Sequence, residues 1–452
     1  MGSGGAATSS QGTGAAGSLT TSAGTESAGT ESAGATTSPQ ETTSGGETSS
    51  GGDTPFDPGP EPLEPIQPLA GEITIIQLDL PATLHGESAI IIGPSGEITL
   101  LDVGGSFHED SVRDRIRDLN TNWITPERGF PASRAPLQVE WMLLTHLHAD
   151  HVGAFRDILG DSDEPLAMVH GVVHRGFVDI GEGVNADDYG DMCTALRGEH
   201  IQLNVELCAP AEAAPCDYDD LMQSHPAVNC DGLRTGNLAV SDDDANGEAA
   251  YIDLGGGARI TLVGVNGFFN DGDALESMTF GVDTGDEENA RSLVGIISHG
   301  DWRYHFGGDL HGRPDDGPDV ESHLIETSAA SFYGDLGVDV VHAHHHARRT
   351  SSNPTFVGAM APMDGRSRNV VAGANGGHLG SPFAEVLAAW GDGGRLGGGN
   401  LWITSVTIGG ATSDELVEAD GEIIVQTAQG GKGYWIQAAG DALQSKAFES
   451  LR

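Results

Sequence analysis

The apolar residues of this chain fall into short runs that recur from about residue 70 onward. Most runs have the length of a strand and either alternate with polar residues or stay apolar, as strands buried on one or both faces do. They lie at residues 73–78, 89–92, 98–101, 139–144, 167–173, 258–265, 293–297, 302–306, 338–341, 401–406 and 421–427. Residues 110–119 and 382–390 have helical spacing instead, and another helical run begins near Ala154. This order predicts two sheets covered by helices, an α/β (α+β) arrangement.

The first 70 residues have a different composition. They are mostly Gly, Ser, Thr and Ala, and the sequence GTESA occurs twice in succession, at 24–28 and 29–33. Such a segment cannot bury enough apolar surface to offset its ordering entropy, so we expect it to be disordered, with a stiffer Pro-rich spacer at 55–68. The chain is therefore divided into a disordered linker at 1–70, one domain at 71–440 and a C-terminal tail at 441–452.

Metal-binding side chains follow the apolar run 139–144. The sequence THLHADHVG at 145–153 contains three imidazoles and one carboxylate: His146, His148, Asp150 and His151. Alternate residues of an extended segment point the same way, so His146 and His148 can act together while the other two turn to a second position. Imidazole and carboxylate ligands suit Zn, Mn or Fe, and two adjacent ions would share such a cluster.

This pattern, together with others in the same order, resembles the metallo-β-lactamase fold. Residues 86–92 and 98–105 look like the opening hairpin of that family, whose second strand ends in Asp-x-Gly. NARSL at 289–293, GGD at 307–309 and HHARRTSS at 345–352 are similar to blocks of the nuclease-like domain of ComEC, the DNA-uptake competence protein. The resemblance covers roughly residues 72–436 apart from one insertion. It implies an αββα sandwich that carries a two-metal hydrolase centre.

The resemblance also assigns metal ligands. His146 and His148 would hold one ion, Asp150 and His151 the other, and Asp309 would bridge both. The residues themselves support Asp309, because the glycines before it allow a close approach of the backbone at a strand end.

The second histidine cluster would supply a further ligand. We place His345 first and His346 second, and we expect His342 and His344 to face solvent or the core. Ala347 and Arg348 stand where the family has Gly and Ser. Related enzymes add another histidine between the two clusters, for which the candidates without matching context are His170, His174, His200 and His225.

Further residues are candidates for catalysis beside the ions. Asp102 ends its strand near the first cluster and would orient a ligand histidine. Asn375 and His378 resemble the family's Asn-x-x-x-His-Pro block near the leaving group, although Pro382 is displaced. Arg348, next to Arg349, would neutralise a phosphate, since a guanidinium matches two phosphate oxygens; the alternative is a solvated arginine pair.

The charge of the chain is strongly negative. Asp and Glu number 67 against 21 Lys and Arg, a formal net charge of −46. This charge repels polyanions at long range, although salt confines the repulsion to about 8–10 Å. It therefore disfavours long nucleic acid and favours a short substrate.

All four cysteines lie in the acidic insertion at about 177–248. An even number in a loop-rich segment predicts two disulfides and an oxidising compartment. We favour Cys208 with Cys216 and Cys193 with Cys230; the alternative is four free thiols. No signal peptide or run long enough to span a membrane is visible. The Ser/Thr/Gly tether nevertheless resembles those that follow the lipid anchor of bacterial lipoproteins. We expect an exported protein, periplasmic, lipoprotein-like or extracellular, with a cytoplasmic location as the alternative.

These observations predict a hydrolase with two divalent ions, Zn or else Mn. It would cleave a phosphodiester bond with a metal-activated hydroxide, Asp150 being both a ligand and a catalytic residue. A carboxylic ester, lactone or thioester is the alternative substrate on the same fold. A non-catalytic exported metal-binding protein is a further alternative, and no protein partner is implied.

Overall fold

The structure is a computed structural model. It describes residues 56–81, 85–160, 166, 168–177, 183–198, 201–210, 228–239, 247–278, 288–313, 317–440 and 443–452. The chain divides into two units, Met1–Thr54 and Pro55–Arg452. The first unit, which holds most of the expected linker, lies outside the described residues, and all that follows concerns the second.

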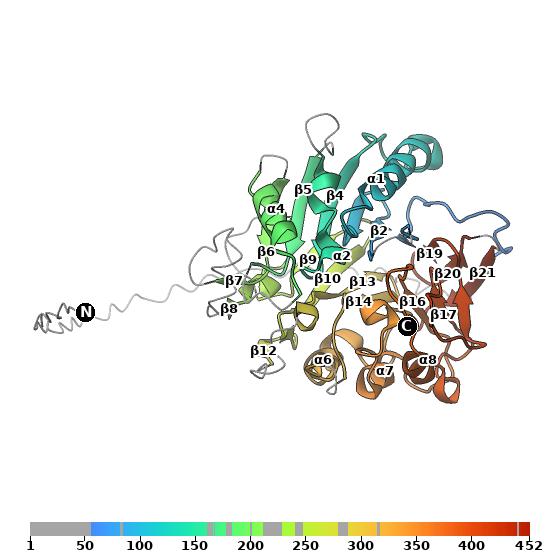
Figure 1. Cartoon of the computed structure of the whole chain (residues 1–452). Helices are drawn as coiled ribbons and strands as arrows, with labels where there is room; N and C mark the ends of the chain where they lie inside the picture. Colours follow the sequence, from blue (N-terminus) through green and yellow to red (C-terminus); the bar gives the residue numbers. More distant parts are fainter. Residues whose placement is uncertain are drawn as a thin grey trace, which may run out of the picture. The chain divides into compact units, whose positions relative to one another are not determined.

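Two sheets form the centre of this unit (Figure 1). The first has the strand order β21-β20-β19-β1-β2-β3-β4-β5-β6. Neighbours from β3 to β6 pair in parallel, so their carboxyl ends meet at one edge. The bounds are β1 (Thr74–Gln77), β2 (Ala89–Ile92), β3 (Ile98–Leu101), β4 (Gln138–Leu144), β5 (Met168–His174), β6 (Ile201–Glu206), β19 (Ile423–Ala428), β20 (Gly433–Ala438) and β21 (Gln444–Glu449).

The second sheet has the order β12-β11-β10-β13-β14-β15-β16-β17-β18, with β9 paired to β10. Neighbours from β14 to β18 pair in parallel. The bounds are β9 (Tyr251–Asp253), β10 (Ala258–Val265), β11 (Phe268–Asn270), β12 (Leu275–Ser277), β13 (Val294–His299), β14 (Trp302–Phe306), β15 (Val340–His342), β16 (Asn369–Ala372), β17 (Leu401–Ile403) and β18 (Leu416–Glu418).

Helices cover the outer face of each sheet (Figure 1). Those on the first sheet are α1 (Glu109–Asp118), α3 (Phe155–Leu159) and α4 (Ala186–Leu196), with the short α2 (Ala149–Val152) at the end of β4. Those on the second sheet are α6 (Val320–Ser328), α7 (Pro354–Met360) and α8 (Ala384–Gly391). The layers are therefore helix, sheet, sheet, helix.

The alternation of side chains along each strand explains these layers. Ile75 of β1 points into the core between the sheets, where it joins a cluster with Trp302 of β14. Its neighbour Ile76 points to the other face and packs in a cluster with Val112 and Ile116 of α1. Successive residues of a strand face opposite sides, so a continuous apolar run is what a strand buried on both faces requires. Trp302 is fully buried, and its truncation to alanine would cost about 3–5 kcal/mol.

Both boundaries that the sequence analysis set for the domain need correction. Residues 443–452 are not a tail: β21 pairs antiparallel with β20, and Leu451 N donates to Asp339 Oδ1 at 2.8 Å. At the other end, Ile66 N donates to Gln437 Oε1 at 2.7 Å, so part of the expected spacer lies along β20. Backbone groups of both segments find partners in the first and second sheets, which local composition does not reveal.

The acidic insertion begins later than predicted, and its cysteines pair differently. α4 and β6 lie within residues 177–248 but belong to the first sheet and its helical layer. Cys208 bonds to Cys230, which rules out both predicted pairs, and Cys193 is also in a disulfide. The short strands β7 (Ala209–Pro210) and β8 (Val228–Asn229) pair with each other beside the Cys208–Cys230 bond, and this pairing brings the two cysteines together.

Candidate metal centre

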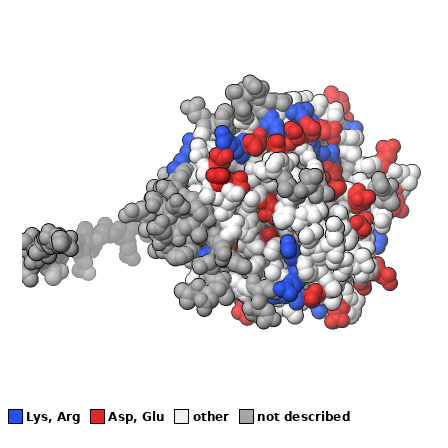
Figure 2. Space-filling view, in the orientation of Figure 1, with Lys and Arg blue, Asp and Glu red and all other residues white. Residues whose placement is uncertain are grey.

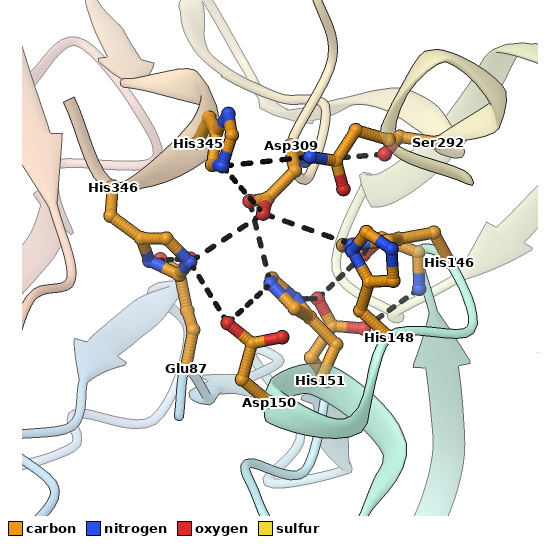
Figure 3. A network of polar contacts seen from close by, with 12 residues as sticks. Glu87, His146, His148, Asp150, His151, Ser292, Asp309, His345 and His346 are labelled. Atoms are coloured by element: carbon orange, nitrogen blue, oxygen red, sulfur yellow. Dashed lines mark hydrogen bonds and ion pairs between the residues drawn. The ribbon is translucent and has the colours of Figure 1, made fainter. Parts of the chain in front are cut away.

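Strand ends from both sheets meet at a cluster of histidine and aspartate side chains (Figure 3). The loop after β4, the turn after β14 and the segment after β15 supply these residues. In Figure 3 the histidine rings and Asp150 surround the carboxylate of Asp309. Carboxyl ends of parallel strands are where an open α/β sheet presents its functional groups.

The loop after β4 carries the first four candidates. His146 and His151 are fully buried, while His148 and Asp150 are half-buried. His146 Nε2 lies 3.2 Å from His148 Nδ1, and Asp150 Oδ2 lies 4.0 Å from His151 Nε2. The structure thus brings together the two pairs that the motif predicted.

Asp102 holds this loop in place. It follows β3 with a left-handed φ of 56° and is buried. Its carboxylate accepts hydrogen bonds from Thr145 N and Thr145 Oγ1, both at 2.7 Å, and from His151 Nδ1 at 2.8 Å. Burial raises the pKa of Asp102 above its usual value, although these contacts oppose the shift. From this position Asp102 would orient the ring of His151 through the hydrogen bond to Nδ1.

Asp309 reaches the cluster because two glycines precede it. A Cβ at Gly308 would lie 2.7 Å from Thr145 Oγ1, and the φ of Gly308 is 52°, so a side chain there would clash. Asp309 is buried, with Oδ1 3.4 Å from His151 Nε2 and Oδ2 3.8 Å from His146 Nε2. One carboxylate therefore faces a histidine of each predicted pair.

The segment after β15 adds both alternatives for the next ligand. His345, His346 and Ala347 all have left-handed φ values of 51°, 52° and 58°. His345 Nε2 and His346 Nε2 each lie 3.6 Å from Asp309 Oδ2. His346 Nε2 also lies 3.5 Å from Asp150 Oδ2 and shares a set of ligand atoms with His151 and Asp309. The geometry favours His346 over His345, which the sequence analysis placed first.

Glu87 completes the cluster and was missed in the sequence. Its Oε2 lies 2.9 Å from His346 Nδ1, and its Oε1 lies 2.6 Å from His342 Nε2. Burial would raise the pKa of Glu87, but His342 and His346 hold it below its ordinary value. The only hint in the sequence is a carboxylate placed directly before the apolar run 89–92.

His342 and His344 lie in the core, one of the two places expected for them. His342 contacts Glu87 from behind the cluster. His344 Nδ1 donates to Glu321 Oε1 at 2.7 Å, and its other nitrogen lies 2.9 Å from His305 Nε2.

The proton positions of the histidines suit a metal. His146 Nδ1 lies 3.0 Å from Thr145 Oγ1, which already donates to Asp102 and so accepts from His146. His151 Nδ1 and His346 Nδ1 likewise face carboxylates. Each ring then carries its proton on Nδ1 and leaves Nε2 unprotonated, so that Nε2 can act as a ligand, which is how metal-bound histidines are held.

Unpaired atoms at the centre support the same conclusion. His151 Nε2, His346 Nε2 and Asp309 Oδ1 are buried without a hydrogen-bond partner among the described residues. Burial would raise the pKa of Asp309, but His346 and His151 hold it well below its ordinary value. Burial lowers the pKa of His151, and the charges of Asp309 and Asp102 outweigh it and raise the pKa well above 6.5. The carboxylates of Asp309 and Asp102 therefore stabilise positive charge at the centre of the cluster, and these donor atoms fit a divalent cation.

A cavity of about 580 Å³ opens onto the cluster. Asp150, Asp309 and His345 line it together with Arg348, which is half-buried. Phe107 also lines the cavity and is 68% exposed. The structure thus brings Arg348 to the site but leaves Arg349 outside this lining.

His378 lies beside the cluster with a different proton position. Its ring stacks on His346 with centroids 3.7 Å apart, and its Nε2 lies 3.5 Å from Asp150 Oδ2. Asn375 N donates to His378 Nδ1 at 3.1 Å, so the proton of the neutral ring is on Nε2. Burial, reinforced by His346, lowers the pKa of His378 to about 4. Although His85, Asp150 and His378 form a further group of ligand atoms, this proton suits a donor rather than a ligand.

None of the described candidates for an additional histidine reaches the cluster. His174 Nε2 donates to Asn204 Oδ1 at 2.9 Å, and its Nδ1 accepts from Gly176 N at 3.1 Å. His170 packs edge-on against Trp141. His200 and His225 lie outside the described residues.

A buried ion pair lies behind the first ligand loop. Glu288 accepts a hydrogen bond from Leu147 N at 2.9 Å and pairs with Arg175 at 2.6 Å. Arg175 and Glu288 are both fully buried. The pair therefore fixes the backbone between His146 and His148.

Comparison with known proteins supports the fold. Residues 82–224 match the model of the Metallo-beta-lactamase superfamily. The αββα metallo-β-lactamase sandwich predicted from the sequence is confirmed. The match covers the first ligand loop and ends before Asp309. No curated protein matches the chain.

Several solved structures are similar at low identity. The metallo-beta-lactamase fold protein YhfI from Bacillus subtilis is 9% identical, with 76% of this chain and 90% of that chain covered at a TM-score of 0.29. A diphosphatase from the PhnP family is 12% identical. The alignment covers 66% of this chain and 85% of that chain, at a TM-score of 0.30. A long form RNase Z from yeast is 12% identical. The alignment covers 78% of this chain and 42% of that chain, at a TM-score of 0.34. The narrower resemblance to ComEC stays a prediction.

Proposed function

We propose that this protein is a metal-dependent hydrolase with a dinuclear centre. His146 and His148 would hold one divalent ion, Asp150, His151 and His346 the other, and Asp309 would contact both. The observation that carries the proposal is the convergence of unpaired, buried Nε2 and carboxylate atoms on Asp309. Zinc suits this mixture of imidazole and carboxylate, and manganese is the alternative.

The protein's own groups would prepare the centre for hydrolysis. When bound, a pair of divalent ions lowers the pKa of a bound water from 15.7 towards about 7 and stabilises developing negative charge. Asp102 orients His151, and Glu87 orients His346, through the contacts of 2.8 and 2.9 Å. His378 holds a proton on Nε2 beside Asp150, where it would donate a hydrogen bond to the leaving group.

Three observations favour a short phosphodiester substrate. Arg348 lines the cavity, where a guanidinium would pair with a phosphate. The cavity of about 580 Å³ suits a small molecule. Figure 2 shows Asp and Glu scattered over the visible face, and the net charge of −46 disfavours long nucleic acid. The resemblance to ComEC points to the same bond.

One observation favours the ester, lactone or thioester alternative. Phe107 presents an exposed aromatic ring to the cavity, and an uncharged acyl substrate would use it better than a phosphate does.

An exported location is proposed with the activity. Cys193, Cys208 and Cys230 are all in disulfides, as an oxidising compartment allows. Within the part of the chain that the structure describes, no helix has the length and apolar character to cross a membrane.

A pair of chromogenic substrates tests the proposal. Zinc-loaded protein is assayed with bis-p-nitrophenyl phosphate and with p-nitrophenyl acetate. We expect hydrolysis of the diester, and Arg348→Ala should lower its kcat/KM about 10- to 100-fold, as loss of a charge-assisted contact of 1.5–3 kcal/mol does. Arg349→Ala is the matched control and should have a small effect. Cleavage of the acetate alone would transfer the proposal to the ester alternative.

A further inference from the structure

A second polar cavity lies on the outer face of the second sheet. It has a volume of about 280 Å³ and shares no lining residue with the cavity at the metal centre. Side chains of β9, β10, β13 and β14 line it from the sheet, and Ser331 and Phe332 of the turn after α6 line it from the other side. Its polar residues are Glu248, Tyr251, Arg259, Thr261, Ser298, Arg303 and Ser331.

Two arginines and one carboxylate, that of Glu248, give the lining of this cavity a surplus of positive charge. Arg303 Nη1 donates to Phe332 O at 2.7 Å, but its Nε is buried without a hydrogen-bond partner among the described residues. Arg259 lies over the ring of Tyr251, with the guanidinium carbon 5.8 Å from the centroid. Burial lowers the pKa of Arg303, and the like charges of Arg452 and Arg259 reinforce the shift.

The nearby carboxylate of Asp339 neutralises this charge only in part. Asp339 Oδ2 accepts from Arg303 N at 2.8 Å and Oδ1 accepts from Leu451 N at 2.8 Å, so both oxygens face backbone donors. Burial raises the pKa of Asp339 to about 7, which reduces its charge further at neutral pH. Glu248 is the one carboxylate among the lining residues. The surplus is unusual in a chain with only 21 basic residues against 67 acidic ones.

The cavity is separate from the metal centre along the sheet. Arg303 lies at the start of β14, whereas Asp309 follows its end. The three strand steps from Arg303 to Phe306 alone span about 10 Å. A ligand in this cavity would therefore not touch the proposed ions.

We propose that this cavity binds a phosphate group. Arg303 and Arg259 would pair with the anion, since guanidinium groups match its oxygens, and the hydroxyls of Tyr251, Thr261 and Ser298 would donate to it. The proposal does not depend on the hydrolase function.

Calorimetric titration of the full chain tests the proposal. The protein is first stripped of metal with a chelator, because phosphate also binds to metal centres. Inorganic phosphate and glycerol phosphate are titrated separately, the first representing the free ion and the second a phosphorylated small molecule. We expect at least one to bind with one site per chain. Whichever binds more tightly identifies the source of the phosphate group.

Variants assign the binding to the cavity. Arg303→Gln and Arg259→Gln should each weaken it roughly 10- to 100-fold. Arg259 is exposed, so its variant should fold even where Arg303→Gln does not. Arg128→Gln is the matched control, because this arginine contacts Trp123 on the side of the first sheet. Absence of binding by either ligand, or binding that survives Arg259→Gln unchanged, would overturn the proposal.

Discussion

His174 should make the stability of this fold sensitive to acid. Its ring is fully buried at the end of β5, with Nε2 donating to Asn204 and Nδ1 accepting from Gly176 N. The contact with Gly176 requires the neutral ring, because protonation of Nδ1 would place two donors against each other. Burial accordingly lowers the pKa of His174 from 6.5 to about 4.

The sign and size of the effect follow from this shift. Between pH 6.5 and 4 the unfolded chain binds a proton at His174 that the folded chain does not, so stability falls as the pH falls through this window. At pH 5 the loss is about 2 kcal/mol relative to pH 7.5, and below pH 4 it approaches about 3 kcal/mol. Above pH 6.5 the contribution of His174 to the free energy of unfolding is constant.

Urea unfolding of the wild type and His174→Gln at pH 7.5 and pH 5 measures this contribution. Glutamine keeps one donor and one acceptor but does not titrate, so its loss of stability between the two pH values should be smaller by about 2 kcal/mol. Other ionisable groups are common to both proteins and cancel in the comparison. His170→Gln on the same strand is the control and should behave like the wild type. An equal loss in wild type and His174→Gln would refute the reasoning.

Three further predictions concern the centre and the disulfide. Asp309→Asn should abolish turnover, with the circular dichroism spectrum unchanged. Elemental analysis should find fewer than the two zinc ions per chain expected for the wild type. A full complement of zinc in this variant would contradict the bridging position of Asp309. Glu87→Gln should weaken zinc binding about 10- to 100-fold, measured by competition with a chromogenic chelator, because His346 loses the carboxylate that orients it; unaltered affinity would make Glu87 a structural residue only. Replacing Cys208 and Cys230 together by alanine should lower the free energy of unfolding by about 3 kcal/mol, since their bond closes a loop of 22 residues; an unchanged urea midpoint would show that the bond does not restrain the unfolded chain.

The local pattern of the sequence predicted part of the strands, such as β2 and β4, and the first ligand loop, but it did not predict β6, β16, β20 or β21. Continuous apolar runs such as 89–92 and 141–144 are what strands buried on both faces need, and that requirement acts residue by residue. The loop at 145–153 carries its ligands within a few residues, so its geometry depends on the end of one strand. The glycines before Asp309 pointed to a close approach for the same local reason.

Only the tertiary structure decided the contacts between distant segments. Glu87 and His346 meet because β2 and β15 belong to different sheets whose ends come together, and nothing near Glu87 in the sequence records this. The preference for His346 over His345 depends on three successive left-handed residues, a conformation that other parts of the fold must enforce. The pairing of Cys208 with Cys230 likewise depends on β7 meeting β8. Side-chain periodicity is a property of the local sequence. Proximity across two sheets is a property of tertiary packing, and the composition of a single segment does not predict it.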